Sequence, residues 1–491
     1  MKTSVFSISV LATVLILGSA SAAWAQEATN LNGPMQAQDM AAPMPTDNPA
    51  TATAPAPANN PATAAVDEGP ETIAGTGQEI TAGTGTDATL DVQPDQAAAR
   101  GMTVTQRNHP EYTPQGTRLG SFRLLPDISL NELFNDNIYA VHNHKTSDWT
   151  TVVEPRLALR SNWHQHALNF LAADAEGIYA SHSHENYSDY LLQSDGRLDI
   201  TRHTRLAGLV SYAQEHEDRS DPNSPNSVFE QTKPVVFQVR TLQAEAFHEF
   251  NRIKLDAIYS NQNFSYNNGD LISGGGRAIN SDRNRMDNSI TGRVAYELTP
   301  TEDVYFQSSY NVRSYDHRDI FDGVYRDSDG YNIFGGLRAD VTGKIFGDIY
   351  AGYLHQNYDS SLYKDYSGVG FGMNGYWNFT QIDTLTINVG RAVEETIIAG
   401  SSSYVESRFR MDWDHELRRN WLLTTEAGYD RDEFQGIGRK DNVYVVGGGL
   451  KYLVNSHFNL YANYDYVDRD SNQTVNSYTQ NRFLVGVKAA L

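Results

Sequence analysis

The chain has 491 residues, a formal net charge of −22 and no cysteine. The lack of cysteine excludes disulfides, thiolate metal sites and a cysteine nucleophile. The acidic charge argues against nucleic acid as a partner because phosphates require a basic face, and the mean hydropathy of −0.51 excludes a bundle of transmembrane helices. Tyrosine outnumbers phenylalanine, 28 to 19, which fits a surface that meets both water and lipid.

Residues 1–25 form a predicted signal peptide. Lys2 supplies a positive start, residues 5–18 are an apolar run, and Ala23-Trp24-Ala25 places small residues where a signal peptidase reads. We expect cleavage before Gln26 and export across the inner membrane. An uncleaved membrane anchor is the alternative, which the shortness of the apolar run disfavours.

Residues 26–115 are predicted to be a disordered, acidic periplasmic leader rich in Pro, Ala, Thr and Gly. They contain 11 of the 17 prolines, and their basic residues are Arg100 and Arg107. They show no apolar periodicity, so they cannot bury enough surface to offset the entropy lost on ordering. The Gly-Thr-Gly phrases at 72–77 and 81–85 lack the Lys-Ser/Thr of a nucleotide loop and indicate low complexity.

Residues 116–491 alternate between apolar and polar positions. In the stretch 304–312, Val304, Phe306 and Val312 fall on one face. Gln307 and Asn311 fall on the other. Such alternation predicts strands with one apolar and one polar face. A soluble β-sandwich also alternates, but charged residues in mid-strand favour a water-filled interior, and aromatics near strand ends suggest the girdles of a membrane barrel. The aromatics expected in the girdles are Tyr259, Tyr296, Tyr353, Trp377, Trp413, Trp421, Tyr429 and Tyr452.

Short and long connections alternate along this region, which gives the strand count. Short turns are predicted at 160–165, 201–204, 249–252, 299–302, 341–344, 379–383, 416–420 and 453–457. Nine longer polar loops separate them. With a first strand near 119–139 and a last strand near 479–491, the sequence predicts a transmembrane antiparallel up-and-down β-barrel of about 18 strands, with 16 as the alternative. Both termini are then periplasmic. Pro126 and Pro155 fall inside predicted strands and indicate either bulges or a later strand start.

The polar face of the strands supplies the candidate functional residues, because it would line the lumen. Mixed charges can bind sugar hydroxyls and aromatic rings can stack on sugar faces; the same residues can also simply line a wet lumen and hold the strands in register. The candidates are Arg293, Glu297, Arg313, Asp348, Glu406, Arg408, Arg410, Asp412, Glu426, Asp430, Tyr305 and Tyr350.

Other motifs point to no specific chemistry. The pairs His142/His144 and His182/His184 lie in predicted loops, which impose no ligand geometry. The aspartate-rich turns at 327–330 and 468–472 lack the glutamate of a calcium loop. No phrase marks a catalytic nucleophile. We therefore expect no metal site, no cofactor and no enzymatic activity, with a membrane-embedded lipid or glycan enzyme as the least favoured alternative.

The stretch from Arg107 to Tyr139 carries a family resemblance. It includes Pro110-Glu111-Tyr112, Arg118-Leu119-Gly120 and Asn135-Asp136-Asn137-Ile138-Tyr139. It resembles the segment that leads into the barrel in the outer-membrane β-barrel porin family of proteobacteria, whose members are often linked to exopolysaccharide export. The motif covers about 30 residues. The chain departs from many such barrels in ending on Leu491 instead of an aromatic residue.

The resemblance implies a function and a set of partners. The leading hypothesis is a passive conduit for exopolysaccharide across the outer membrane, and the alternative is a general or small-solute porin. The expected partners are outer-membrane lipid and lipopolysaccharide, the barrel-assembly machinery, and a polysaccharide or small solute, with no nucleic acid.

Overall fold

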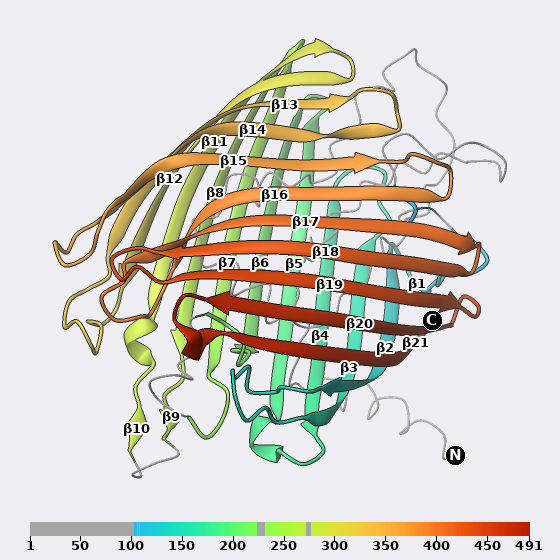
Figure 1. The fold of residues 1–491 in the computed structure, drawn as a ribbon. Coiled ribbons are helices and arrows are strands. Elements are labelled where there is room, and N and C mark those ends of the chain that lie inside the picture. The colour runs from blue at the N-terminus through green and yellow to red at the C-terminus, as the bar shows by residue number, and fades with distance from the viewer. Residues whose placement is uncertain (1–102, 106, 108, 223–230, 272–275) are drawn as a thin grey trace, which may run out of the picture.

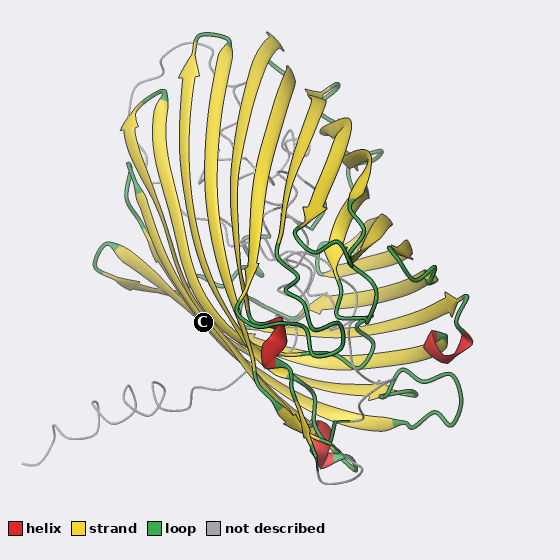
Figure 2. Cartoon of the chain, turned by 90° about the vertical axis from the view of Figure 1, so that its left-hand side faces the viewer, coloured by secondary structure: helices red, strands yellow, loops and turns green. Residues whose placement is uncertain are grey.

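The computed structural model describes residues 103–105, 107, 109–222, 231–271 and 276–491. The predicted signal peptide and most of the predicted leader lie outside the described residues. Among the described residues, no helix is long and apolar enough to cross a membrane. The helices there are single 3₁₀ turns, η3 (Ser183–Glu185), η5 (Ser281–Arg283) and η6 (Thr474–Asn476), and Figure 2 shows them as small additions to a strand-built molecule.

Long antiparallel strands follow one another around a closed barrel (Figure 1). The large sheet has 19 strands, of which β1 (Thr117–Leu119) is a short lead-in paired with β2. The others are β2 (Phe122–Asn135), β3 (Asp148–Ser161), β4 (Ala167–Tyr179), β5 (Tyr187–Thr201), β6 (Thr204–His216), β7 (Val236–Phe250), β8 (Ile253–Tyr266), β11 (Arg285–Thr299), β12 (Glu302–Tyr315), β13 (Ser328–Asp340), β14 (Ile345–Tyr358), β15 (Tyr366–Trp377), β16 (Asp383–Glu395), β17 (Ser403–Arg418), β18 (Trp421–Phe434), β19 (Lys440–Leu453), β20 (Phe458–Ser471) and β21 (Tyr478–Ala490). A separate two-stranded ribbon, β9 (Gly269–Asp270) with β10 (Arg277–Ala278), extends from the loop after β8.

The barrel closes between its first and last long strands. β2 pairs with β21 from Asp127 opposite Ala490 to Asn135 opposite Arg482. Closure pairs the backbone N–H and C=O groups of the edge strands, which lipid could not hydrogen-bond. The prediction of 18 barrel strands is therefore confirmed, and the alternative of 16 is wrong.

The eight predicted short turns all join neighbouring strands at one end of the barrel, here called the turn end. Long loops gather at the opposite loop end. The first strand differs from its prediction, because β2 ends at Asn135 and residues 136–139 already belong to the loop that leads to β3. Pro126 and Pro155 lie inside β2 and β3 without shifting the β2–β3 register, so neither marks a bulge. Instead, Glu154 and Pro155 are skipped in the pairing of β3 with β4.

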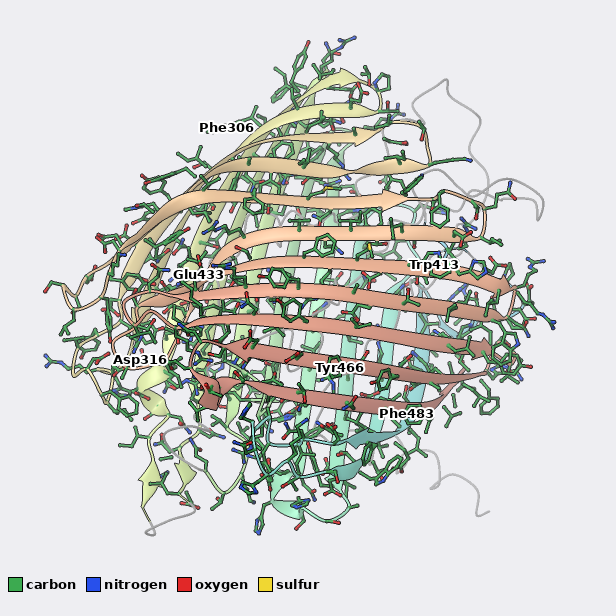
Figure 3. The ribbon with its side chains drawn as sticks, in the orientation of Figure 1. Phe306, Asp316, Trp413, Glu433, Tyr466 and Phe483 are labelled. Carbon is green, nitrogen blue, oxygen red and sulfur yellow. The ribbon has the colours of Figure 1, made fainter. Side chains whose placement is uncertain are left out.

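Along each strand, alternate residues form an apolar outer face and a polar inner face. In β12, Phe306 is 54% exposed and its neighbour Gln307 is 2% exposed. Phe306 and Phe483 lie on the outer surface of the barrel (Figure 3). Large apolar side chains on the outside and polar side chains inside are the pattern that a bilayer demands of a spanning barrel.

Outward aromatic residues form two rows, and only one row lies at strand ends. Tyr296 and Trp377 stand beside the turn end, as expected. Tyr353 lies in the middle of β14, opposite Ile333 of β13, with its ring centroid 6.1 Å from that of Tyr331. Its place is eight residues beyond Ile345, or about 27 Å along the strand. Because the strands continue past the second row, the prediction that Tyr259, Tyr353 and Tyr429 end their strands is wrong.

Candidate functional site

The twelve predicted lumen residues lie on the inner side of the wall, opposite the exposed apolar side chains. They occupy β11 (Arg293, Glu297), β12 (Tyr305, Arg313), β14 (Asp348, Tyr350), β17 (Glu406, Arg408, Arg410, Asp412) and β18 (Glu426, Asp430). They do not form one site. Five of them make a single network, and the others belong to different parts of the wall.

The network joins β17 and β18 through two arginines and three carboxylates. Arg410 binds Asp430 with two hydrogen bonds, Nη1 to Oδ1 at 2.7 Å and Nη2 to Oδ2 at 2.5 Å. Its Nε lies 3.8 Å from Glu426. Arg408 donates to Glu406 at 2.8 Å and lies 3.4 Å from Asp430. The charges are thus largely neutralised along the wall, within a surface that remains polar.

Tyrosine rings on the inner face lie over glycines of the neighbouring strand. Tyr305 stands opposite Gly336 and Tyr350 opposite Gly372. A Cβ at Gly336 would come within 2.2 Å of the Tyr305 ring, and one at Gly372 within 2.0 Å of the Tyr350 hydroxyl. Arg293 covers Tyr305, with its guanidinium carbon 4.3 Å from the ring centroid. Both tyrosines are buried, so their rings pack against the barrel wall.

The wall has a seam between β15 and β16. These strands pair from Trp377 opposite Leu385 only as far as Gly372 opposite Gly390. Beyond this glycine pair, β15 continues beside β14, and β16 continues beside β17. The barrel wall therefore separates in its loop-end half.

Beyond the seam, residues 391–405 turn into the barrel; we call this segment the folded-in hairpin. It comprises the loop-end parts of β16 and β17 with their connecting loop. Val405 has the outward parity of Phe409, yet Val405 is 1% exposed and Phe409 is 37% exposed. Val405 and Val393 cluster with Phe334 and other inner-face residues of β13 to β15. The apolar side chain of Val405 is therefore covered, because the hairpin lies beneath the neighbouring wall.

Glu395 anchors the folded-in hairpin to the inner face of β12 and β14. Its carboxylate is paired with the guanidinium of Arg313 on β12. It also accepts a hydrogen bond from the Tyr315 hydroxyl at 2.7 Å and lies 3.5 Å from the Tyr358 hydroxyl of β14. We call Arg313, Tyr315 and Tyr358 the carboxylate cradle. Arg313 is 1% exposed, and the Glu395 carboxylate balances its buried positive charge.

Arg326 ties the same hairpin to the loop between β12 and β13. Its Nη1 donates to the carbonyl oxygens of Thr396 at 2.7 Å and Ser401 at 2.8 Å. Its Nε donates to Asp319 at 2.8 Å. Burial alone would lower the pKa of Arg326, but the adjacent Asp319 carboxylate raises it above its ordinary value. Arg326 therefore stays charged and holds the hairpin loop from two sides.

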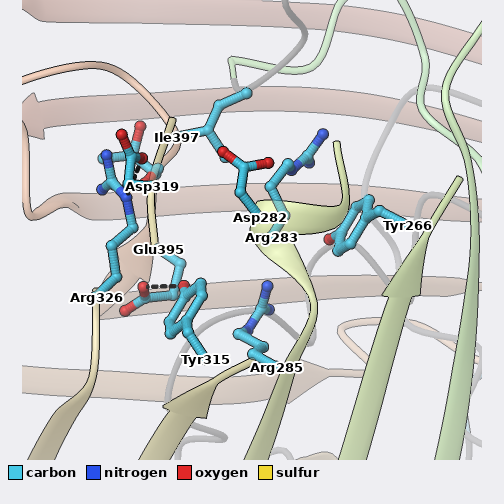
Figure 4. Close-up of a pocket in the computed structure, with 10 residues that line it drawn as sticks. Tyr266, Asp282, Arg283, Arg285, Tyr315, Asp319, Arg326, Glu395 and Ile397 are labelled. Carbon is cyan, nitrogen blue, oxygen red and sulfur yellow. Dashed lines mark hydrogen bonds and ion pairs between the residues drawn. The ribbon is translucent and has the colours of Figure 1, made fainter. Parts of the chain in front are cut away.

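A small pocket, lined mainly by polar and charged residues, lies between the hairpin and the loop-end wall (Figure 4). The hydroxyl of Tyr266 and the Nε of Arg283 are buried and have no hydrogen-bond partner among the described residues. Lining residues are Tyr266, Asp282, Arg283, Arg285, Tyr315, Asp319, Arg326, Glu395, Thr396 and Ile397.

The turn end of the lumen holds part of the N-terminal segment. Val104 is fully buried against Leu422 and Leu453, and its backbone N–H donates to the Thr384 hydroxyl at 2.8 Å. Glu111 lies 3.4 Å from Arg419 in the turn between β17 and β18. Residues of the predicted leader thus pack into this mouth of the barrel.

Among the histidine pairs of the loops, His182 binds the buried carboxylate of Asp148 through Nδ1 at 2.8 Å. In the described part of the chain, no group of three or more His, Cys, Asp or Glu side chains is placed to hold a metal ion.

Sequence reasoning found Arg313 of the cradle but missed Tyr315, Tyr358 and the pocket. Arg285 and Tyr315 share the inward parity of the predicted set, so alternation could have found them. Glu395 could not be found this way, because it has the outward parity of Val393. Only the inward turn of the hairpin brings Glu395 to the lumen.

Comparison with known proteins identifies the family of this chain. No curated protein matches the sequence. Among solved structures, OpdO of Pseudomonas aeruginosa has a TM-score of 0.41 and 13% identity, covering 76% of this chain and 98% of that one. The siderophore receptor PiuA of Acinetobacter baumannii has a TM-score of 0.41 and 9% identity, covering 77% and 82%. The family described as "Putative beta-barrel porin 2" matches residues 109–491. The chain therefore belongs to this family of outer-membrane β-barrel porins.

Proposed function

We propose that the protein is a passive conduit through which a secreted exopolysaccharide crosses the outer membrane. Family membership makes it an outer-membrane porin, and the cargo is our proposal. The observation that carries it is the paired charge on the inner wall, where Arg408 and Arg410 are held by Glu406, Glu426 and Asp430.

Paired charges suit a moving carbohydrate chain. A pair offers donors and acceptors to sugar hydroxyls but leaves little net field to trap a charged group. A polymer can therefore exchange hydrogen bonds with wall and water at low cost. Transport would be driven by diffusion or by thrust from synthesis upstream, since the sequence contains no nucleotide loop.

In the proposed orientation, the turn end of the barrel faces the periplasm. With the signal peptide of residues 1–25 removed, residues 26–115 would lie in the periplasm, and the turn end with both termini would face the same compartment. The long loops would face the lipopolysaccharide, and insertion would use the barrel-assembly machinery. Short periplasmic turns and long external loops are the usual arrangement in bacterial barrels.

The test combines genetics with reconstitution. Deleting the gene should reduce exopolysaccharide in the medium and raise it in the periplasm, and the wild-type gene on a plasmid should restore secretion. In planar bilayers, purified oligosaccharides of that polymer should interrupt the current of the reconstituted channel. Unchanged secretion together with a current that the oligosaccharides never interrupt would refute the proposed cargo.

A small-solute porin is the second candidate, and a specific observation favours it. The folded-in hairpin narrows the loop end and the segment around Val104 narrows the turn end. Liposome swelling distinguishes the candidates. A small-solute porin would admit monosaccharides and disaccharides, and deletion of its gene would leave polymer secretion unchanged.

A further inference from the structure

We propose that the N-terminal segment, described in residues 103–105, 107 and 109–115, is a displaceable plug that restricts the turn end of the channel. It docks through Val104, which sits in an apolar seat on the inner wall. This inference rests on the channel function but requires neither a polymer nor secretion. It gives the N-terminal segment a role in controlling passage and names the contacts through which it does so.

The seat for Val104 consists of apolar side chains at inward positions of the wall. Leu422 has the inward parity of Glu426 on β18, and Leu453 has that of Lys451, which stands opposite Leu422. The two leucines are 8% and 7% exposed, and they cluster with Val104, which is fully buried. Inward positions of a wide membrane barrel face water. Docking of Val104 therefore removes apolar surface from water on both sides of the contact.

A hydrogen bond fixes the position of Val104 in the seat. Its backbone N–H donates to the Thr384 hydroxyl oxygen at 2.8 Å, and that hydroxyl donates to the side-chain oxygen of Asn378 at 2.6 Å. Because the hydroxyl proton is used on Asn378, the oxygen of Thr384 is left to accept. Both wall residues are buried. The seat thus combines an apolar contact with one specific acceptor, which distinguishes docking from non-specific adhesion.

The N-terminal segment runs inside the turn-end mouth from one part of the wall to another. The Gly116 N–H donates to the Leu491 carbonyl oxygen at 2.8 Å, at the junction of β2 and β21. Val104, in contrast, is bound to β16. Five strands, β17 to β21, separate β16 from β2 around the sheet. The segment therefore lies in the path of a solute that enters the barrel from its turn end.

The docked segment buries polar groups that it leaves unpaired. The Nε and Nη2 of Arg107 and both ring nitrogens of His109 are buried and have no hydrogen-bond partner among the described residues. The Glu416 carboxylate attracts the Arg107 charge, but burial has the larger effect, so the pKa of Arg107 lies below its ordinary value. Unpaired buried groups regain hydrogen bonds with water on release. Docking is therefore opposed from within the segment itself.

The attachments that favour docking are few. Glu111 lies 3.4 Å from Arg419, but their side chains are 42% and 61% exposed, and exposed pairs contribute little. The apolar contact of Val104 is thus the main attachment, and it breaks no strand ladder when it is lost. Release is also reversible, because the segment stays joined to β1 and β2 through Gly116, and a tethered group rebinds at high effective concentration.

The experiment records single channels of the full-length protein in planar bilayers with potassium chloride. We expect two conducting levels, a lower one with the N-terminal segment docked and a higher one with the segment released. V104E places an unpaired carboxylate against the two leucines, which should lower the docked-to-released ratio about tenfold or more and so favour the higher level. L453K should do the same from the side of the wall. Q115E is the matched control, because it adds the same charge to the same segment at an exposed position; it should conduct as the wild type does.

The combination of V104E with L453K distinguishes a specific contact from general damage to the barrel. The carboxylate and the ammonium group can pair in the seat, so the double variant should recover most of the lower level that each single variant loses. Two harmful changes without a shared contact would add their effects instead.

Hydrogen exchange supplies a readout that does not depend on current. In detergent, the Val104 amide should exchange slowly in the wild type, because it is bound to Thr384, and faster in V104E. V104E and L453K channels that conduct as the wild type does would overturn the plug while leaving the channel function intact, as would a Val104 amide that exchanges at the rate of an unstructured peptide in the wild type. A wild-type protein that forms no channel would refute the channel function instead.

Discussion

At the scale of single residues, the inner wall depends on tyrosine rings that cover glycines. Tyr350 lies over Gly372, and Tyr305 lies over Gly336. A glycine removes the Cβ that would hold the ring away from the strand, so the aromatic surface can be buried on the sheet itself. The sequence marked both tyrosines as sugar-stacking candidates, but packing makes them part of the wall.

The Gly372→Ala change tests this packing. Its Cβ would lie 2.0 Å from the Tyr350 hydroxyl oxygen, so the ring must move, and we expect a loss of about 1–3 kcal/mol in the free energy of unfolding. Denaturant titration in detergent measures it. Combining the change with Tyr350→Leu should recover most of the loss. Gly335→Ala is the control, because its Cβ would meet nothing within 4 Å, and a loss there as large as at Gly372 would contradict the explanation.

Arg410 is the central cation of the β17–β18 network. Arg410→Met removes the positive charge that pairs with the buried carboxylates of Asp430 and Glu426. Breaking a buried ion pair in this way lowers the free energy of unfolding by about 3–5 kcal/mol. The same titration measures the effect. Arg431→Met removes an exposed partner of Glu433 and should cost at most about 1 kcal/mol. Equal losses in the two variants would show that burial does not set the strength of the network.

At the scale of elements, the N-terminal segment responds to pH through His109. Both ring nitrogens of His109 are buried without a hydrogen-bond partner among the described residues. Burial lowers its pKa below the ordinary value of 6.5, although Glu416 and Glu111 act in the opposite direction. A lowered pKa means that the docked segment prefers neutral histidine, so docking is fully stable above about pH 6.5 and weakens as the pH falls.

Limited proteolysis measures how far the N-terminal segment undocks as the pH falls. Trypsin should cleave after Arg107 faster in protein pre-equilibrated at about pH 5 than at about pH 8, once both samples are assayed briefly at one pH. His109→Gln should remove the difference, because its side chain does not titrate. Identical cleavage of the two wild-type samples would mean that His109 does not control docking.

At the scale of the whole molecule, the barrel region carries an acidic excess. Residues 116–491 contain 35 basic and 49 acidic residues, and a net negative charge around a passage concentrates the opposite ion. We therefore expect the reconstituted channel to prefer potassium to chloride. The reversal potential in a potassium chloride gradient measures this preference, which should weaken at high salt. A preference for chloride would place the effective charge of the passage with its arginines.

The sequence by itself determined the barrel. Alternation sorts each strand into an apolar and a polar face, and turn spacing sets the number of strands. Both are local properties, so they can be read from neighbouring residues. The inward side of Arg293, Arg408 and Asp430 follows from the same parity.

Only the tertiary structure decided what happens beyond the seam. Val393, Glu395 and Val405 have the parity of lipid-facing residues, and nothing local distinguishes them from Phe409. Their environment is set by residues far along the chain, such as Arg313 and Phe334, which receive the folded-in hairpin. Parity states which side of a strand a residue occupies; whether that side meets lipid or another part of the wall depends on long-range packing.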